Sequence, residues 1–400
     1  MQRVVIIDPD FEQLGGHNIT ANEVIAAHTK APLDIVCSSG LPEEFILEGA
    51  TVRPVLPFNS YEAHQRSTSL SRKVRTQFQK LLRRKPGPQS DETGFGVELL
   101  RVFRSMDISA HDALIVHTGS AVVLNAIMDA LDGVSEADWP DLHFRQLRPL
   151  ENMSYERTAH RRLQRMQGLG KLFMYAETNS FAAKLATLGY DRREIELVEF
   201  SDISRPLNSR PDPEAEFEVA MLGTVRTEKG HGQLVSIARS YRAIVERQGG
   251  PPMKLLIQTG AVKNRKLYRT MLDDLGEAGI NFELAGEDTG LAGHWTCLQR
   301  CHAVIMPYDH RRYVERGSGI GIDAVAHARP LVVAGNSTLE EYIRNGNGIA
   351  ANGDRQMAEA LHDIAMNYAG FADNALELAK VFRKQQMQNA LFKRLNASAS

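Results

Sequence analysis

The chain has few cysteines, almost no net charge and no long apolar run. Its three cysteines cannot build a disulfide framework, and so low a count in 400 residues favours a reducing compartment. The formal net charge of −2 excludes a general affinity for nucleic acid or for an anionic membrane and leaves only local patches open. No apolar stretch approaches the roughly 18 residues of a membrane span, and residues 1–10 are typical of a first β-strand and not of a signal peptide. We therefore expect a cytoplasmic protein.

Signatures of common cofactors are also missing. The G-x-G-x-x-G fingerprint of dinucleotide-binding proteins does not follow the first expected strand. Gly15 and Gly16 stand at that strand-to-helix junction instead, where backbone N–H groups can approach an anion. Cys297 and Cys301 are four residues apart, but no second ligand pair accompanies them, so a buried helix explains them better than a metal site. We expect neither a metal ion nor an organic cofactor.

What the chain does contain is a repeated alternation of short apolar runs with helical stretches. The runs lack a strict polar–apolar alternation, as expected for strands that are covered on both faces. Their alternation with helices predicts parallel β-α-β units and an α/β fold. The runs are RVVIID, LDIVCS, ALIVHT, LHFRQL, KLFMYA and IELVEF in the first half, and FEVAMLG, MKLLIQTG, INFELAG, HAVIMPY and PLVVAG in the second.

A proline-rich stretch divides the chain into two α/β halves. At 400 residues the chain is too long for one comfortable core, so two domains are expected. Residues 204–216 hold three prolines and almost no apolar side chains, which is typical of a linker. The sequence thus predicts an N-terminal domain over residues 1–204, a linker over 205–216 and a second domain over 217–374.

A basic segment over residues 63–90 stands apart from this pattern. It holds eight Lys or Arg residues and no acid, and four apolar residues fall on one helical stripe. One interpretation is an amphipathic helix that contacts the inner face of an anionic membrane or an anionic acceptor. The other is a surface helix that packs on its own domain.

A loop in the second half carries two cations. A strand ends near Gly223, the loop supplies Arg226 and Lys229, and a helix begins near Gly230. Two cations beside the start of a helix suit a diphosphate. Taken alone, the same pair also fits two solvated loop charges.

A glycine-rich stretch further on places carboxylates on both sides of a loop. Glu315 precedes Gly317, Gly319 and Gly321, and Asp323 follows them in the expected first turn of a helix. Carboxylates accept hydrogen bonds from hydroxyls, while loop amides and the helix dipole favour a phosphate between them. Hydroxyl, phosphate and hydroxyl in this order are the pattern of a nucleotide sugar. The alternative is that Asp323 only caps the helix.

Together these segments resemble the GT-B glycosyltransferases, in particular the retaining family GT4. The resemblance covers most of the chain and is strongest over residues 217–354. Glu315 and Asp323 form Glu-x7-Asp where the family has Glu-x7-Glu. GTVRTEKG, AHARPLVV and STLEEYIRNGNGIAANGD resemble further family segments in order and spacing, with Thr224 at the family's arginine position and Arg226 two residues on.

The resemblance implies two Rossmann-like domains that face each other across a cleft, with the acceptor on the N-terminal side and the donor on the C-terminal side. Residues 375–400 would form a helix that crosses back to the N-terminal domain. Each site residue would then have a role: Glu315 at the transferred sugar, the amides of Gly317, Ser318 and Gly319 at the sugar and the diphosphate, Asp323 at the ribose, Arg226 and Lys229 at the leaving diphosphate, Gly15 and Gly16 opposite it, and His117, His143 or Arg145 near the reacting sugar.

The implied reaction moves a glycosyl unit from a nucleotide diphosphate sugar to an acceptor hydroxyl, with retention of configuration and without a metal ion. The acceptor would be a glycan, a lipid-linked saccharide or a small molecule, as in polysaccharide biosynthesis. Two rivals are a GT-B nucleotide-sugar epimerase and a non-catalytic protein that binds nucleotide sugars or assists assembly. No nucleic-acid partner is expected. The sequence leaves the sugar, the base, the acceptor and the oligomeric state open.

Overall fold

The chain folds into two parallel α/β domains in a computed structural model. The structure describes residues 3–12, 17–42, 44–57, 59, 95–147, 153–208, 213, 215–258, 265–285 and 290–397. Gly15, Gly16 and the basic segment 63–90 lie outside the described residues.

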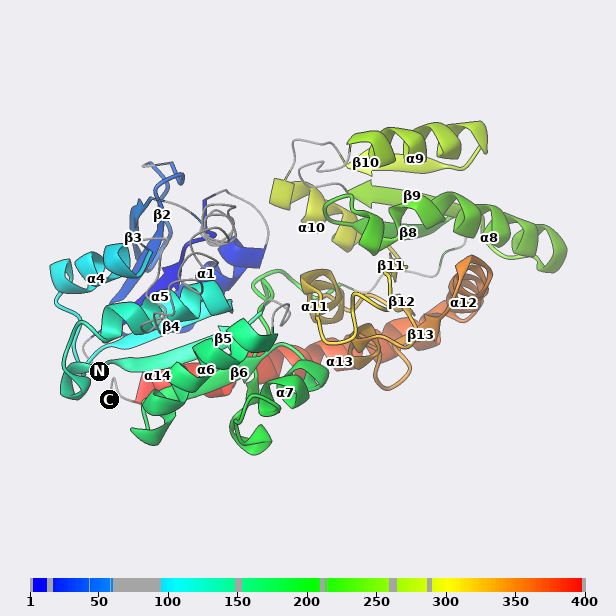
Figure 1. Cartoon of the computed structure of the whole chain (residues 1–400). Helices are drawn as coiled ribbons and strands as arrows, with labels where there is room; N and C mark the ends of the chain where they lie inside the picture. The colour runs from blue at the N-terminus through cyan, green and yellow to red at the C-terminus, as the bar shows by residue number, and fades with distance from the viewer. Residues whose placement is uncertain are drawn as a thin grey trace, which may run out of the picture.

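Each domain is built on one sheet (Figure 1). The first sheet has the strand order β3-β2-β1-β4-β5-β6-β7 and the second has the order β10-β9-β8-β11-β12-β13. The strand pairs are parallel in both sheets, which confirms the prediction of two Rossmann-like domains. The strands are β1 (Val4–Asp8), β2 (Leu33–Ser38), β3 (Thr51–Leu56), β4 (Ala113–Gly119), β5 (Asp141–Gln146), β6 (Leu172–Ala176), β7 (Glu196–Leu197), β8 (Phe217–Leu222), β9 (Met253–Gln258), β10 (Phe282–Ala285), β11 (Ala303–Met306), β12 (Leu331–Ala334) and β13 (Gly348–Ala351).

Two strands, β3 and β13, have no counterpart among the apolar runs of the sequence. Both lie at a sheet edge and are partly exposed. β3 contains Pro54, which lacks the N–H that a central strand needs, and β13 is a Gly-Ile-Ala-Ala run with few residues that favour strands. Edge strands carry less apolar patterning than central ones, so the sequence signal was weak at both positions.

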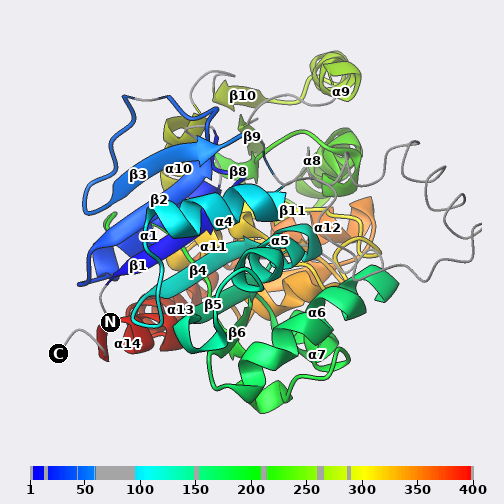
Figure 2. The ribbon, with the colours of Figure 1, turned by 60° about the vertical axis from the view of Figure 1, so that its left-hand side comes forward.

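Helices cover both faces of the first sheet (Figures 1 and 2). Val5 and Ile7 of β1 pack with α4 to α7, whereas Val4 and Ile6 pack with α1 and α14. Successive side chains of a strand point to opposite faces, so a strand covered on both sides reads as one continuous apolar run. The helices of this domain are α1 (His17–His28), α4 (Phe95–Ser105), α5 (Ala121–Leu131), α6 (Met153–Gly168) and α7 (Asn179–Ala186), with short 3-10 turns η1 (Glu136–Asp138) and η2 (Arg192–Glu194).

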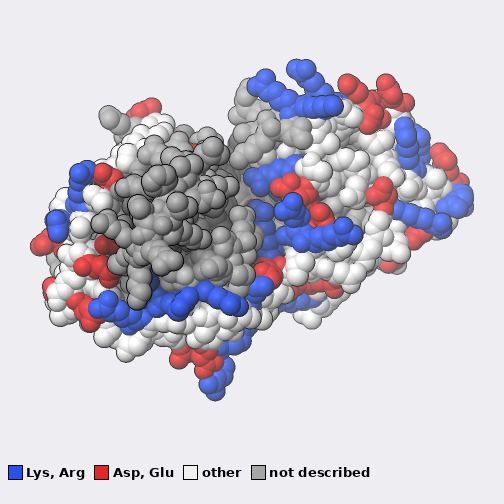
Figure 3. Space-filling model, in the orientation of Figure 1, with Lys and Arg blue, Asp and Glu red and all other residues white. Residues whose placement is uncertain are grey.

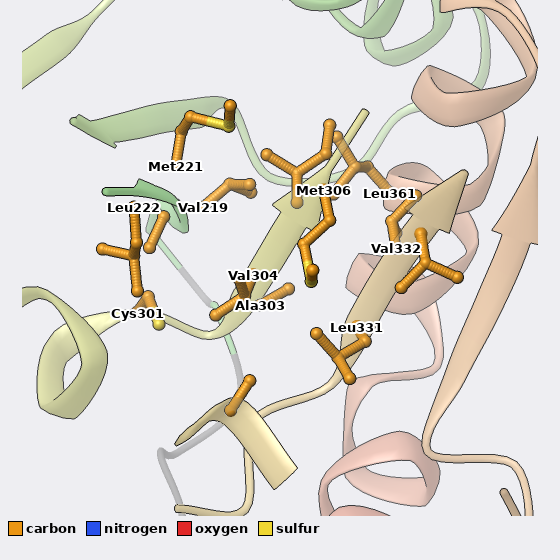
Figure 4. Packing of buried hydrophobic residues seen from close by; sticks show 14 of the residues in the cluster. Val219, Met221, Leu222, Cys301, Ala303, Val304, Met306, Leu331, Val332 and Leu361 are labelled. Carbon is orange, nitrogen blue, oxygen red and sulfur yellow. The ribbon is translucent and has the colours of Figure 1, made fainter. Parts of the chain in front are cut away.

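The second domain encloses its own apolar core. Figure 4 shows Met306 of β11 beside side chains of the neighbouring strands, including Val219 and Val332, and all three are fully buried. Its helices are α8 (Leu234–Gln248), α9 (Arg265–Glu277), α10 (Gly290–Arg300), α11 (Gly319–Ala326) and α12 (Asp354–Met366), with 3-10 turns η3 (Thr227–Lys229), η4 (His231–Gln233) and η5 (Thr338–Tyr342).

The C-terminal end of the chain returns to the first domain as two helices, α13 (Tyr368–Met387) and α14 (Ala390–Ala397) (Figure 1). Leu391, Phe392 and Leu395 of α14 lie in the core of the first domain. The sequence suggested one helix here. The break arises because the Asn389 side chain accepts the N–H of Phe392 at 2.9 Å and so begins a new helix.

The strand orders locate the crevice of each sheet. The order reverses between β1 and β4 in the first sheet and between β8 and β11 in the second. Ligands of open parallel sheets bind outside the carboxyl ends of the strands at such a reversal, because the connecting loops there diverge to opposite faces. The loops after β8 and β11 carry the two segments that the sequence marked as chemical, so the topology brings them together.

Candidate functional site

The loop after β8 lies directly against the loop after β11. A Cβ atom on Gly230 would stand 2.0 Å from the carbonyl oxygen of Pro307, and the φ angle of Gly230 is +75°. Both facts require glycine at this position. The two loops are also joined by a hydrogen bond from the Asp309 N–H to the Glu228 carbonyl, at 2.8 Å.

These loops gather three cations, Arg226, Lys229 and Arg316. The Lys229 ammonium is half-buried over the ring of Tyr308, 5.5 Å from the ring centre. Burial, and then the positive charges of Arg226 and Arg316, lower the pKa of Lys229 from 10.5 to about 7, which the nearby Glu228 only partly opposes. No carboxylate within the described ranges forms an ion pair with Lys229. A bound anion would relieve this mutual repulsion of like charges.

The cations stand beside the N-terminus of α11. A Cβ atom on Gly223 would lie 2.7 Å from both Lys229 Nζ and the side chain of Ile320, so the ammonium is close to the first turn of that helix. The first intrahelical bond there runs from the N–H of Ile322 to the carbonyl of Ser318, at 3.1 Å. The preceding N–H groups, those of the helix start at Gly319, are the ones that a helix offers to an anion.

The glycine-rich loop is shaped by what packs behind it. A Cβ atom on Gly317 would lie 2.4 Å from the Glu177 carboxylate and 2.7 Å from the hydroxyl of Tyr342. A Cβ atom on Gly321 would lie 2.5 Å from the Tyr342 ring. The N–H of Ser318 donates to the Tyr342 hydroxyl at 2.9 Å, so this amide, one of those predicted to line the ligand, already has a partner inside the protein.

Solved structures resemble the chain over its whole length. It aligns over 100% of its length, at a TM-score of 0.62 and 12% identity, with 99% of HepE from Anabaena, a structure that contains UDP and glucose. The N-terminal domain of trehalose-6-phosphate phosphatase from Candida albicans matches at a TM-score of 0.68 and 8% identity, over 100% of this chain and 97% of that one. The UDP-forming α,α-trehalose-phosphate synthase of Burkholderia vietnamiensis matches at 0.62 and 12%, over 99% of both chains.

The chain has the GT-B fold. No protein-family model matches the sequence, and no curated protein matches it either. Identities this low establish the architecture alone. The comparisons therefore show two Rossmann-like domains that face each other. The chemistry of this GT-B chain has to be argued from its own residues.

Glu315 lies where the two domains meet. Its carboxylate Oε1 is 3.1 Å from the Lys184 ammonium of α7, and its carbonyl accepts a hydrogen bond from the Thr178 hydroxyl at 3.1 Å. Both partners belong to the first domain. The loop that carries Glu315 is thus held from the far side of the boundary between the domains.

Asp323 occupies the second turn of α11 and not the first, as the sequence suggested. The helix begins at Gly319, with Ser318 as its N-cap residue, and so it includes Gly319 and Gly321. Each glycine costs a helix roughly 1 kcal/mol, which a helix tolerates. Asp323 Oδ1 accepts from the hydroxyl of Ser201 at 2.7 Å, and Oδ2 pairs with His294 Nε2 at 2.9 Å. The alternative in which Asp323 caps the helix therefore does not hold.

Polar groups of the first domain bind one another at the carboxyl ends of β1 and β4. His117 Nε2 lies 2.8 Å from Asn22 Oδ1 and 3.3 Å from Asp8 Oδ2, and its side chain is 1% exposed. Asp8 also accepts from the amides of Asn18 and Asn22 at 2.9 and 3.0 Å. His117 thus reaches the edge of the sheet as part of a hydrogen-bond network through Nε2, while its buried Nδ1 has no hydrogen-bond partner among the described residues.

His143 and Arg145 lie on the same strand, β5, but have different surroundings. His143 is in the middle of the strand, with Nδ1 2.9 Å from the Tyr175 hydroxyl, and burial and then the charge of Arg394 lower its pKa to about 3. The structure does not bring His143 to the cleft end. Arg145 donates to the His117 carbonyl at 3.1 Å and to Glu177 at 3.3 Å. Since Glu177 packs against Gly317, Arg145 is linked to the glycine-rich loop of the other domain.

Several residues of this region were not anticipated: Lys184, Glu177, Arg316, Glu341 and Tyr342. Arg316 adjoins Glu315 in the sequence, so a census of charge around the glycines would have found it. The burial of Glu177, which raises its pKa, has no sequence signal because it depends on the approach of the other domain.

On the face of the molecule drawn in Figure 3, Lys and Arg side chains lie along the boundary between the two domains. Among the residues that the structure describes, no group of three or more His, Cys, Asp or Glu side chains is placed to hold a metal ion. Within the same ranges, no helix is both long and apolar enough to cross a membrane.

Proposed function

We propose that this chain is a glycosyltransferase of the GT4 type, which transfers a hexosyl unit from a nucleotide diphosphate sugar to an acceptor hydroxyl with retention of configuration. One observation carries the proposal. Arg226, Lys229 and Arg316 converge beside the N-terminus of α11, where burial and mutual repulsion lower the pKa of Lys229 to about 7. A diphosphate supplies the negative charge that such a cluster lacks.

UDP is the first nucleotide to test. The Anabaena neighbour of the same fold contains UDP and UDP-glucose, and the Burkholderia neighbour is a UDP-forming synthase. These observations concern those proteins, and they support a UDP-hexose as the first candidate donor here.

In the proposed reaction the glycosidic carbon separates from the diphosphate through an oxocarbenium-like state. Arg226, Lys229 and Arg316 neutralise the charge that grows on the leaving phosphate, a stabilisation larger in the transition state than in the ground state. Glu315 contacts the transferred sugar, and Asp323 contacts the ribose through the lone pairs that Ser201 and His294 leave. Fixed cations take the place that a metal ion has in other phosphate-transfer sites, so we expect activity to persist in EDTA.

The acceptor side of the proposal rests on the first domain. Arg145 and His117 stand at the carboxyl ends of their strands, and Gly15 and Gly16 remain predicted contacts of the diphosphate. A glycan or lipid-linked acceptor, a cytoplasmic location and a peripheral membrane contact through residues 63–90 belong to the same proposal.

The test has two stages. UDP, GDP and ADP are titrated calorimetrically into the full chain at pH 7, and nucleotide sugars of the bound base are then incubated with acceptors while nucleotide release and product anomer are followed. Lys229→Met should weaken UDP binding by about tenfold or more, whereas Lys380→Met, which removes an exposed lysine paired with Glu377 on α13, should bind UDP normally. Absence of binding for every nucleotide would refute the proposal. Tight binding without transfer to any acceptor would favour a non-catalytic nucleotide-sugar-binding protein.

A further inference from the structure

Glu341 of η5 joins the second domain to the start of α7 in the first. Its two carboxylate oxygens accept the backbone N–H groups of Asn179 and Ser180 at 2.7 and 2.9 Å. The side chains of the same two residues donate to it at 3.1 and 2.8 Å. Four hydrogen bonds therefore cross between the domains at one carboxylate.

This contact is stronger than an ordinary surface ion pair. The first N–H groups of a helix have no partner within the helix and carry its positive dipole end, so a carboxylate there forms charge-assisted bonds. Glu341 is also half-buried, which limits screening by water. Thr178 caps the same helix, since its hydroxyl accepts the N–H of Phe181 at 3.1 Å.

The element that carries Glu341 also holds the glycine-rich loop from behind. The N–H of Thr338 donates to the carbonyl of Tyr313 at 2.7 Å, and its hydroxyl donates to that of Val314 at 2.5 Å. At the other end of η5, the Tyr342 hydroxyl accepts the N–H of Ser318. η5 thus forms hydrogen bonds with residues before and after Glu315.

The helix that Glu341 holds contacts Glu315 from the front. Thr178 binds the Glu315 carbonyl, and Lys184, less than two turns further along α7, pairs with its carboxylate at 3.1 Å. Glu315 therefore lies between η5 of its own domain and α7 of the other. A displacement of α7 would remove the cation that orients this carboxylate.

We propose that Glu341 is a positioning residue, which fixes the N-terminus of α7 so that Lys184 and Thr178 hold Glu315 in place across the boundary between the domains. The consequence for Glu315 in catalysis rests on the proposed function; the mechanical link between η5, α7 and residues 313–318 does not. Of the proposed nucleotide contacts, Arg226 and Lys229 lie outside residues 313–318, so loss of the link should affect nucleotide binding less than it affects Glu315.

The first experiment compares Glu341→Ala with Glu341→Gln and with Glu340→Ala. Glu340 is the matched control, because it is exposed and its carboxylate accepts the Asn336 N–H inside its own domain. Glu341→Ala should lower kcat about tenfold or more while the calorimetric Kd for UDP changes less than about twofold, since the lost interactions act on the sugar side. Glu341→Gln keeps one acceptor oxygen, so its kcat should lie between those of Glu341→Ala and the parent protein. Glu340→Ala should have the kcat and the Kd of the parent protein. A weakened UDP affinity with unchanged kcat would overturn the proposal.

A double-mutant cycle tests whether Glu341 affects Glu315 through Lys184. If Glu341 acts through Lys184, Glu341→Ala and Lys184→Met together should reduce kcat little more than either change alone. Fully additive losses would show that Glu341 does not act through Lys184 and would sink that part of the proposal.

Hydrogen exchange of the full chain tests the link without any substrate. In Glu341→Ala, amide exchange should rise in peptides from α7 and also in peptides covering residues 313–318, and Glu340→Ala should change neither. A rise confined to α7 would refute the coupling. If the parent protein proves inactive with every donor while both peptides respond, the proposed function fails and the positioning link stands.

Discussion

The charged groups on the two sides of the boundary between the domains have opposite kinds of neighbours. In the first domain, buried Asp8 is surrounded by donors from Asn18, Asn22 and Thr118, with His117 alongside. In the second, burial and then the charges of Arg226 and Arg316 lower the pKa of Lys229, while Arg226 itself pairs with Glu228 at 3.7 Å. In the first arrangement the carboxylate of Asp8 accepts hydrogen bonds from side chains of its own domain. In the second, no carboxylate of the described residues forms an ion pair with Lys229, and the proposed diphosphate would supply the opposite charge.

This difference indicates that the two sides contribute to different properties: the first to the stability of the fold and the second to the proposed ligand binding. A satisfied buried network contributes to folding, because the removal of one member leaves the others desolvated and unpaired. A cluster of like charges detracts from folding and contributes to binding instead. Mutations on the two sides should therefore act on different measurements.

The largest effect is expected for Asp8→Ala. It leaves several buried donors without their acceptor, so the free energy of unfolding should fall by about 3–5 kcal/mol. Urea unfolding measures this, with Glu98→Ala as the control, since Glu98 forms an exposed pair with Arg101 on α4 and should cost less than about 0.5 kcal/mol. Equal losses in the two variants would mean that the Asp8 network is not stabilising.

Lys229→Met should show the reverse behaviour. Loss of one cation that faces a developing anion should lower kcat/KM roughly 30- to 1000-fold, equivalent to about 2–4 kcal/mol. The free energy of unfolding should stay constant or rise, because the change removes a charge that its surroundings disfavour. Steady-state kinetics and urea unfolding of one preparation test both statements, and a variant that unfolds more easily would contradict the comparison.

The low pKa of Lys229 predicts that the proposed nucleotide binding depends on pH. A diphosphate raises that pKa, so binding above pH 7 takes up a proton, and UDP affinity should fall by about tenfold between pH 7.5 and 9, above the titration of the phosphate near 6. Lys229→Met should remove most of this slope. Without ligand, the unfolded chain holds the extra proton between pH 7 and 10.5, so Lys229 should make stability rise with pH across that window. A Kd independent of pH would refute this linkage.

The smallest effect is expected for Asp323→Asn. The amide keeps one acceptor oxygen for Ser201 or His294, so the free energy of unfolding should drop by about 1 kcal/mol. A ribose contact binds ground and transition states alike, so the donor KM should rise severalfold while kcat changes little. An unchanged KM would mean that Asp323 binds Ser201 and His294 but does not contact the donor.

Much of the fold could be read from the sequence because parallel strands covered by helices are apolar throughout. Central strands such as β1 and β8 carried that signal, while edge strands β3 and β13 did not, since edges need less apolar area and admit Pro54 or glycine. The glycine-rich loop was also visible. The packing around that loop was not visible, because the side chain of Glu177, which comes from the other domain, lies where a Cβ atom on Gly317 would be.

The sequence by itself determined the local chemistry: which loops carry cations, which carry carboxylates, and how far apart they stand along the chain. Arg226 and Lys229 are three positions apart along the chain, and Glu315 and Asp323 are eight positions apart. The tertiary structure decided the partners. Lys184 meets Glu315, and Glu341 meets Asn179, across 131 and 162 residues of sequence. Such contacts depend on how two separately folded sheets face each other, and the short-range patterns of a sequence report the burial of each sheet but not that orientation.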